Sequence, residues 1–186
     1  MVAYLIDGYN LLHAMGVLRG RVGPRGLEKA RLRLLGLLGG ALGSDASQAT
    51  IIFDAASAPA GAKDSQEFQG IHVRFAIHHE EADDLIEALI RQHSTPKQLA
   101  VVSDDRRLQA AARRRHCRAV GCLDFLEELE RTRRRRRPKS DQTPEKQDPS
   151  REDMDRWLRA FADLDSEPEM KKLFGPFDFG SCDEGK

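Results

Sequence analysis

Aspartate residues follow three short apolar segments of this chain. Asp7 comes after residues 2–6, Asp54 after residues 49–53, and the pair Asp104 and Asp105 at the end of residues 99–103. A fourth acidic run, residues 80–84, contains Asp83 and Asp84 and precedes an apolar, helix-like pattern. Carboxylates gathered in one place bind hard divalent cations such as Mg²⁺ or Mn²⁺. Such a site would support metal-assisted hydrolysis of a phosphodiester.

The segments that must position these acids alternate between strand and helix patterns. Strands are predicted over residues 2–6, 49–53, 71–77, 99–103 and 117–121. Helices are predicted over residues 25–42, 82–93 and 106–116, with a last one from Asp124 through Leu129 into an arginine run. Alternating strands and helices predict a three-layer α/β fold, a parallel sheet with helices on both faces. The carboxyl ends of parallel strands share one edge, so the four acidic segments should converge there.

Each acid also has a purely structural explanation, because aspartate is favoured at helix N-termini and in turns. Asp105 precedes a predicted helix, and Asp83 lies in the first turn of another. Two carboxylates about 5 Å apart repel by about 3 kcal/mol at an effective dielectric of about 20. Because no lysine lies within the four acidic segments, a shared divalent cation is the economical way to neutralise the cluster.

Charge divides the chain into a basic body and an acidic tail. Residues 1–137 hold 22 basic and 17 acidic residues, whereas residues 138–186 hold 8 and 13. Six of the seven residues from Arg131 to Arg137 are arginine. Arg106, Arg107, Arg133, Arg134 and Arg135 are therefore predicted to contact substrate phosphates.

Three regions are expected along the chain. Residues 1–130 form the α/β domain, residues 131–149 an arginine-rich segment and linker, and residues 150–186 an amphipathic helix with an acidic tail. The helix carries Met154, Trp157 and Phe161 at helical spacing, and is expected to dock on this chain or on a protein partner. No stretch is apolar enough to cross a membrane, and three cysteines without paired spacing suit a reducing cytoplasm.

Four motifs, LIDGYNLLHA, IIFDA, EEADDLIEALI and VVSDDRRLQAAA, resemble the PIN-like NYN nuclease superfamily, specifically its YacP-like bacterial branch. The resemblance covers about residues 1–130. It implies a PIN-like, Rossmann-like fold and a Mg²⁺- or Mn²⁺-dependent endoribonuclease. It also implies that the RNA is mRNA cleaved on or near the ribosome, which would then be a partner.

The resemblance also implies roles for individual residues. Asp7, Asp83 and Asp105 match metal-binding acids, and Asn10 matches an adjacent orienting amide. Ser103 occupies the position of a threonine in the family pattern, Asp54 matches an acid of that pattern, and both are expected to contact the substrate. Asp104 falls in a variable position, so the choice between Asp104 and Asp105 as the main ligand stays open.

The alternative is a catalytically idle PIN-like module that binds RNA or the ribosome through its arginines. Such a module would tolerate the loss of acids, whereas this chain retains every acid that the nuclease requires. The sequence therefore favours the enzyme. It leaves open the RNA sequence or reading-frame preference, one metal or two, and the oligomeric state.

Overall fold

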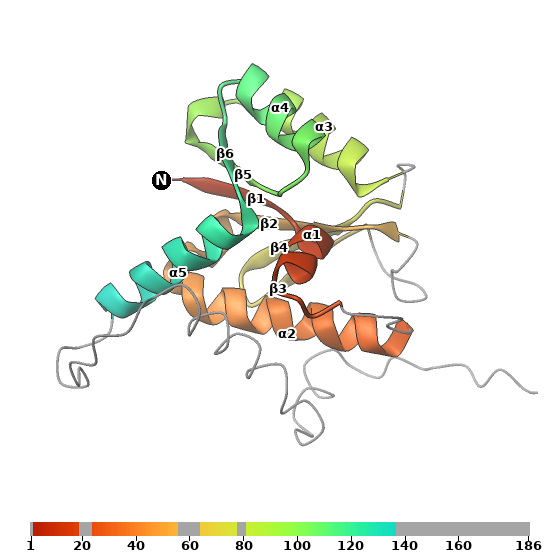
Figure 1. Ribbon diagram of the computed structural model, residues 1–186, viewed down its shortest axis with the longest axis vertical. Helices are drawn as coiled ribbons and strands as arrows, with labels where there is room; N and C mark the ends of the chain where they lie inside the picture. The colour runs from red at the N-terminus through yellow and green to blue at the C-terminus, as the bar shows by residue number, and fades with distance from the viewer. Residues whose placement is uncertain (1, 19–23, 56–63, 78–80, 137–186) are drawn as a thin grey trace, which may run out of the picture.

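A six-stranded sheet in the order β3-β4-β2-β1-β5-β6 forms the centre of the computed structural model, which describes residues 2–18, 24–55, 64–77 and 81–136 (Figure 1). The strands are β1 (Ala3–Asp7), β2 (Ala49–Phe53), β3 (Ser65–Phe68), β4 (Ile71–Phe75), β5 (Leu99–Val102) and β6 (Arg118–Val120). The helices are α1 (Gly8–Ala14), α2 (Pro24–Leu42), α3 (Ala82–Gln92), α4 (Arg106–Arg114) and α5 (Cys122–Arg136). Short 3₁₀ turns, η1 (Gly43–Gln48) and η3 (Pro96–Gln98), lead into β2 and β5.

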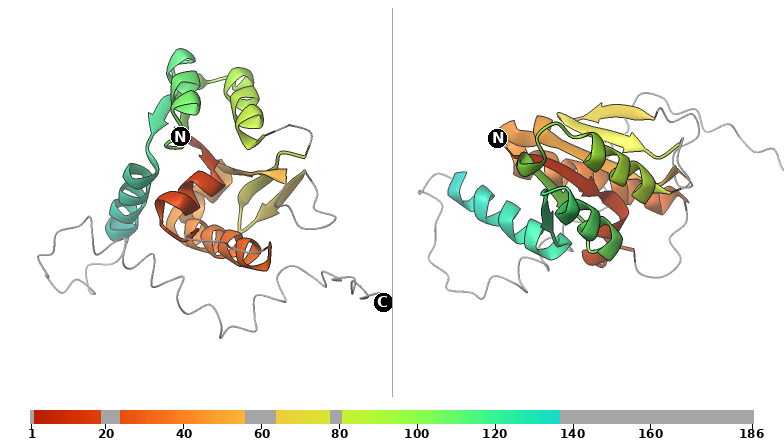
Figure 2. Two further views of the ribbon diagram at one scale, coloured as in Figure 1. Left: turned by 45° about the vertical axis from the view of Figure 1, so that its right-hand side comes forward. Right: turned by 90° about the horizontal axis from the view of Figure 1, so that it is seen from above.

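Helices cover both faces of the sheet, as predicted. Helices α1, α2 and α5 lie on one face and α3 and α4 on the other (Figures 1 and 2). The first face buries the larger core, which includes Ile6, Leu34, Phe53 and Phe125. The second buries Leu5, Ile52, Ile86 and Leu108. The three-layer α/β class is confirmed.

The order of the strands reverses at β1, which is central to the site. The chain passes from β1 to β2 on one side, and later returns to place β5 against the other side of β1. In open α/β sheets, ligands bind beside the carboxyl ends of the strands at such a switch point. Asp7, at the end of β1, lies at this switch point.

One strand of the sheet is antiparallel, so the prediction of a wholly parallel sheet is corrected. Strand β3 pairs antiparallel with β4 at the sheet edge, in a segment expected to be a loop. Its sequence, SQEF, is mostly polar and exposed, so it lacks the apolar pattern that identifies a core strand. A tight turn at Gln69 (φ 48°) and Gly70 (φ 83°) returns the chain into β4.

Two helices also differ from expectation. Helix α1 follows directly from Asp7, where no helix was predicted, and it buries Leu11 and Leu12. Helix α5 begins at Cys122 instead of Asp124 and continues to Arg136, so the arginine run extends the last helix across residue 130.

Arg137, the linker, and the helix of Met154, Trp157 and Phe161 lie outside the described residues. None of the described helices combines the length and apolar character that a membrane span requires.

Candidate active site

Asp7 is a buried carboxylate that joins β1 to α1. Its side chain is 8% exposed, and its Oδ1 accepts the backbone N–H of Asn10 at 3.1 Å, which caps α1. Its Oδ2 accepts the hydroxyl hydrogen of Ser103 at 3.2 Å. Burial raises the pKa of Asp7 above its usual value, and the hydrogen bonds from Asn10 and Ser103 offset part of that rise. A carboxylate that is desolvated in this way gains most from a nearby cation.

Ser103 ties Asp7 to Asp105 through one hydroxyl. Ser103 follows β5 and is fully buried. While its hydroxyl donates to Asp7, its oxygen accepts the N–H of Asp105 at 3.1 Å. Asp105 in turn caps α4, because its Oδ1 accepts the N–H groups of Arg107 and Leu108 at 2.6 and 3.1 Å. The structural role foreseen for Asp105 therefore coexists with a position beside Asp7.

Asp83 completes a group of three carboxylates that we call the acidic edge (Asp7, Asp83 and Asp105). It lies in the first turn of α3 and is half-buried. Burial, followed by the charges of Asp7 and Asp105, raises the pKa of Asp83 to about 6. Because each of the other two carboxylates contributes to this rise, the three lie within electrostatic reach of one another. They come from three separate strand or helix junctions.

Asp104 belongs to a different network, centred on Asn10. The Asn10 Oδ1 accepts the N–H of Asp104 at 3.1 Å and the thiol of Cys122 at 3.4 Å. Asp104 Oδ1 accepts the N–H of Cys122 at 2.9 Å, so it holds the start of α5. Its charge, after burial, raises the pKa of the Cys122 thiol. Asp105 rather than Asp104 is thus the member of the pair that couples to Asp7 and Asp83.

Cys122 was not anticipated as part of the site. It is fully buried, and it lies 112 residues from its hydrogen-bond partner Asn10. No local motif marks this pairing, because only the adjacency of α1 and α5 brings the two side chains together. The one signal available in the sequence was a cysteine that lies between a predicted strand and a predicted helix.

The arginines predicted to contact substrate fall into two groups. Arg107 bridges α3 and α4, with ion pairs to Asp84 at 2.7 Å and Glu87 at 2.8 Å. Arg133 and Arg134 both bind Glu130, which is buried. Arg106 and Arg135 are exposed, as are the ion-paired Arg107 and Arg134. The ion pairs show that part of the positive charge counted in the sequence is already neutralised within the fold.

Asp54 follows β2 and is half-buried. It is not among the main groups that shift the pKa of Asp7 or Asp83.

The donor chemistry of the acidic edge suits a hard divalent cation, since all its ligand atoms are carboxylate oxygens. Within the described residues, no three His, Cys, Asp or Glu side chains are already close enough together to form a metal-binding cluster. Carboxylates that share no cation repel one another, which favours a wider separation of their oxygen atoms. Mg²⁺ needs only one or two protein carboxylates and keeps several waters, so this spacing is compatible with binding.

The raised pKa of Asp83 predicts how stability depends on pH. In the folded protein the Asp83 carboxyl group keeps its proton up to about pH 6, whereas in the unfolded chain it releases the proton near pH 3.8. Between these values the fold holds more protons, so the free energy of unfolding falls as the pH rises. In the presence of chelator, we expect this group to make the protein less stable at pH 7.5 than at pH 5.5. The expected difference in melting temperature is on the order of 2–4 °C, limited by solvent screening.

Calorimetry of the wild-type protein and of Asp83→Asn would test this expectation. The variant should lose much of the pH response, and at pH 7.5 without metal it should be no less stable than the wild type. Mn²⁺ should raise the wild-type melting temperature at pH 7.5 and raise that of Asp83→Asn much less. An identical pH response in both proteins would contradict the proposed coupling.

Comparisons with known proteins agree with this geometry. A family model described as the YacP-like NYN domain matches residues 4–163. The crystal structure of Rae1 (YacP) from Bacillus subtilis is similar at TM-score 0.58 and 25% identity, covering 73% of this chain and 77% of that chain. A tryptophan-to-leucine mutant of Rae1 gives a TM-score of 0.56 at 24% identity, covering 73% and 79%. A search of curated proteins finds no match.

Proposed function

The chain belongs to the YacP-like NYN domain family, and on this basis we propose that it is a divalent-metal-dependent endoribonuclease. The family lies within the PIN-like nuclease superfamily, so an RNA nuclease is the coarser assignment. The finer assignment rests on one observation. Asp7, Asp83 and Asp105 come from three separate junctions at the topological switch point of the sheet, where burial, and then the charges of Asp7 and Asp105, raise the pKa of Asp83.

In this proposal Asp7, Asp83 and Asp105 hold Mg²⁺ or Mn²⁺. When bound, the cation supplies Lewis-acid polarisation of the phosphodiester and activation of the attacking water. Hydrolysis then adds the water oxygen to phosphorus while one P–O ester bond breaks, leaving a phosphomonoester and a free hydroxyl. The protein contributes a pre-positioned set of oxygen ligands that requires little rearrangement during the reaction.

The surrounding residues position the acids. We assign Ser103 to this role in place of the substrate contact expected from sequence, because its hydroxyl is buried and shared by Asp7 and Asp105. Asn10 has the same type of role, since its amide oxygen fixes the loop at Asp104. Arg107 keeps α3 beside α4. Of the five arginines predicted to contact substrate, we propose that role for the exposed Arg106 and Arg135.

We propose mRNA on the ribosome as the substrate, which is the context implied by the resemblance noted from the motifs. A cytoplasmic location follows from that proposal. Asp54 remains a proposed substrate-side residue, and the segment beyond Arg136 a proposed docking element for the protein itself or a partner.

Incubation of the full chain with labelled single-stranded RNA, with Mn²⁺ or with chelator, tests the activity. A parallel reaction with translating ribosomes is needed, because cleavage that depends on the ribosome would be missed with naked RNA. We expect internal cleavage with Mn²⁺ in at least one of the two reactions and none with chelator. RNA binding without cleavage in both reactions would overturn the nuclease and favour the idle binding module.

A further inference from the structure

Helices α3 and α4 cover only part of their face of the sheet. Leu5 of β1 and Val101 of β5 are buried beneath them. On β4 the same face presents polar side chains, His72 and Arg74, which alternate with the buried Val73. Of the described helices, none lies over β3 and β4 on this side (Figure 2). The uncovered part of the face is therefore polar and open.

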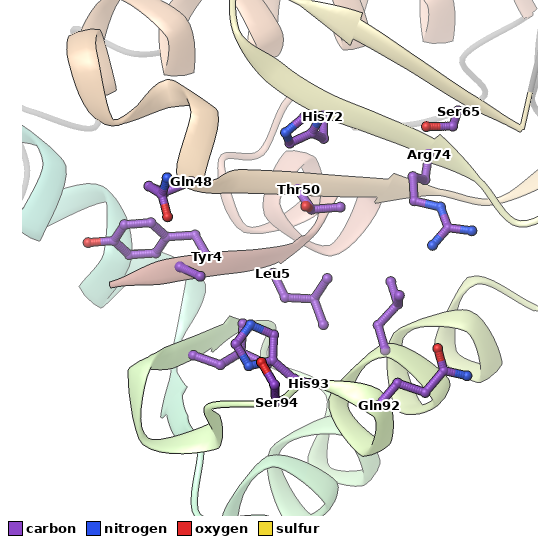
Figure 3. A pocket seen from close by; sticks show the side chains of 13 residues that line it. Tyr4, Leu5, Gln48, Thr50, Ser65, His72, Arg74, Gln92, His93 and Ser94 are labelled. Atoms are coloured by element: carbon purple, nitrogen blue, oxygen red, sulfur yellow. The ribbon is translucent and has the colours of Figure 1, made fainter. Parts of the chain in front are cut away.

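A groove of about 650 Å³ lies between the first residues of β1, β2 and β5, the strand β4 and the C-terminal end of α3. Most of it is therefore nearer the amino ends of the parallel strands than the acidic edge. Its volume falls within the range of about 300–1,000 Å³ that is usual for ligand sites. Several polar side chains line this groove, and we use the name polar groove for six of them: Thr50, Ser65, His72, Arg74, Gln92 and His93 (Figure 3). Among the described residues that line it there is an arginine but no aspartate or glutamate. This composition is the opposite of the acidic edge, and favours an anionic ligand.

Arg74 is the strongest feature of the polar groove. Its side chain extends from β4 towards α3 (Figure 3). The Nε atom is buried and has no hydrogen-bond partner within the described residues. A buried donor without a partner destabilises the fold, and more so when it is charged. A phosphate oxygen would satisfy it, because guanidinium matches phosphate geometry through two parallel hydrogen bonds.

Neighbouring side chains add further donors. The His93 Nδ1 accepts the backbone N–H of Thr95 at 3.3 Å, which leaves its Nε2 as the ring atom available to donate. Thr50 lies beside His72 in the pairing of β2 and β4. A hydroxyl, a ring nitrogen and the Gln92 amide can therefore contact an anion or a ribose near Arg74.

The register of the sheet connects this groove to the acidic edge. Asp7 pairs with Ile52, and Ile52 pairs with Arg74, so the three residues form one row across β1, β2 and β4. Partners in a parallel register project to the same face. Two strand spacings, about 10 Å, therefore separate the strand positions of Arg74 and Asp7. Ile52, which lies between them, is fully buried, so a strand of RNA that contacts both Asp7 and Arg74 has to follow the surface around it.

We propose that the polar groove binds the phosphodiester backbone of the RNA strand at nucleotides beyond those at the cleaved bond. The proposal rests on the proposed function, because it takes RNA as the substrate. Arg74 would contact a phosphate, while Thr50, His72 and His93 would contact the adjoining phosphate or ribose. Free mononucleotides share this phosphate chemistry, and the experiment separates them from an RNA chain.

Binding of a labelled single-stranded RNA to the full chain, measured by fluorescence anisotropy in chelator, tests the proposal. Arg74→Gln should weaken binding about tenfold at low salt. It should also reduce the slope of log affinity against log salt by about 0.7, the contribution of one phosphate contact. Arg74→Lys should retain most of the slope, because it keeps the charge. Each variant is first compared with the wild type by thermal melting.

Arg91→Gln is the matched control, because Arg91 is an exposed arginine of α3 outside the groove. An equal loss with Arg91→Gln would show a general charge effect and overturn the proposal, as would unchanged binding by Arg74→Gln. If Arg74→Gln weakens binding of a nucleoside monophosphate but not of the RNA, the groove is a nucleotide site and the proposal fails.

These measurements do not require cleavage, so the two proposals can fail separately. A wild-type protein that binds RNA through Arg74 but never cleaves it would overturn the nuclease and leave the groove assignment standing. A protein that cleaves RNA equally well with Arg74→Gln, and binds it equally well, would leave the nuclease and overturn the groove.

Discussion

Replacing Asp7 with asparagine is expected to lower the rate of RNA cleavage at least about 100-fold. Mutating residues that merely support metal ligands typically lowers metal affinity or activity 10- to 100-fold, so loss of a proposed ligand should exceed that. Asparagine keeps the shape of the side chain, and its carbonyl can still accept the N–H of Asn10. It removes a buried charge whose pKa is raised by desolvation, so the metal-free fold should not lose stability.

Cleavage rates and melting curves of the same preparations would separate chemistry from folding. Asp64→Asn is the matched control, since Asp64 is an exposed aspartate beside the edge strand β3, three strands away from β1, and should retain wild-type activity. Equal cleavage by Asp7→Asn and the wild type, in preparations free of contaminating nuclease, would exclude Asp7 from the reaction.

Gly8→Ala is expected to destabilise the fold by about 2–3 kcal/mol, a typical effect of overpacking. Gly8 is buried in the first turn of α1, and a Cβ added there would lie 2.2 Å from Cε1 of Phe53. Phe53 has little room to move, because it is fully buried against Tyr9 and Phe75, with ring centroids at 5.2 and 6.0 Å. The glycine is therefore required because a larger side chain has no space beside Phe53.

Gly36→Ala provides a control of opposite sign. A Cβ at Gly36 in α2 meets nothing within 4 Å, so alanine should stabilise the helix by about 0.5–1 kcal/mol. Chemical denaturation of both variants measures the difference. The additional change Phe53→Leu should cost less in the Gly8→Ala background than in the wild type, because it relieves the clash. Two alanine variants of equal stability would contradict the steric argument.

Much of the fold could be predicted because its core strands are short apolar runs and its helices are amphipathic. The convergence of Asp7, Asp83 and Asp105 followed from one rule, that parallel strands end at a common edge. Strand β3 could not be predicted in the same way, because its residues are polar and its pairing with β4 is set by the tertiary fold. Helix α1 was missed although Asp7 has the residue type of a helix cap.

The finer geometry of the site depends on contacts that no local pattern encodes. The sequence left Asp104 and Asp105 equivalent, and only their hydrogen bonds distinguish them. One caps α4 beside Asp7, and the other holds the start of α5. Likewise, counting arginines overestimated the free positive charge, because Arg107, Arg133 and Arg134 are paired with acids across or along helices.

The hydrogen bonds of Asp7 and Asn10 also determine when the site can exist during synthesis. Their partners Ser103, Asp104 and Cys122 lie 96, 94 and 112 residues further along the chain. Contacts of such long sequence separation form late in folding, after the cost of closing the intervening loop. A nascent chain that has not yet released α5 therefore holds Asp7 without the groups that orient it. The proposed nuclease would stay inactive while it is being translated, and would gain the ability to cut RNA only as a finished domain.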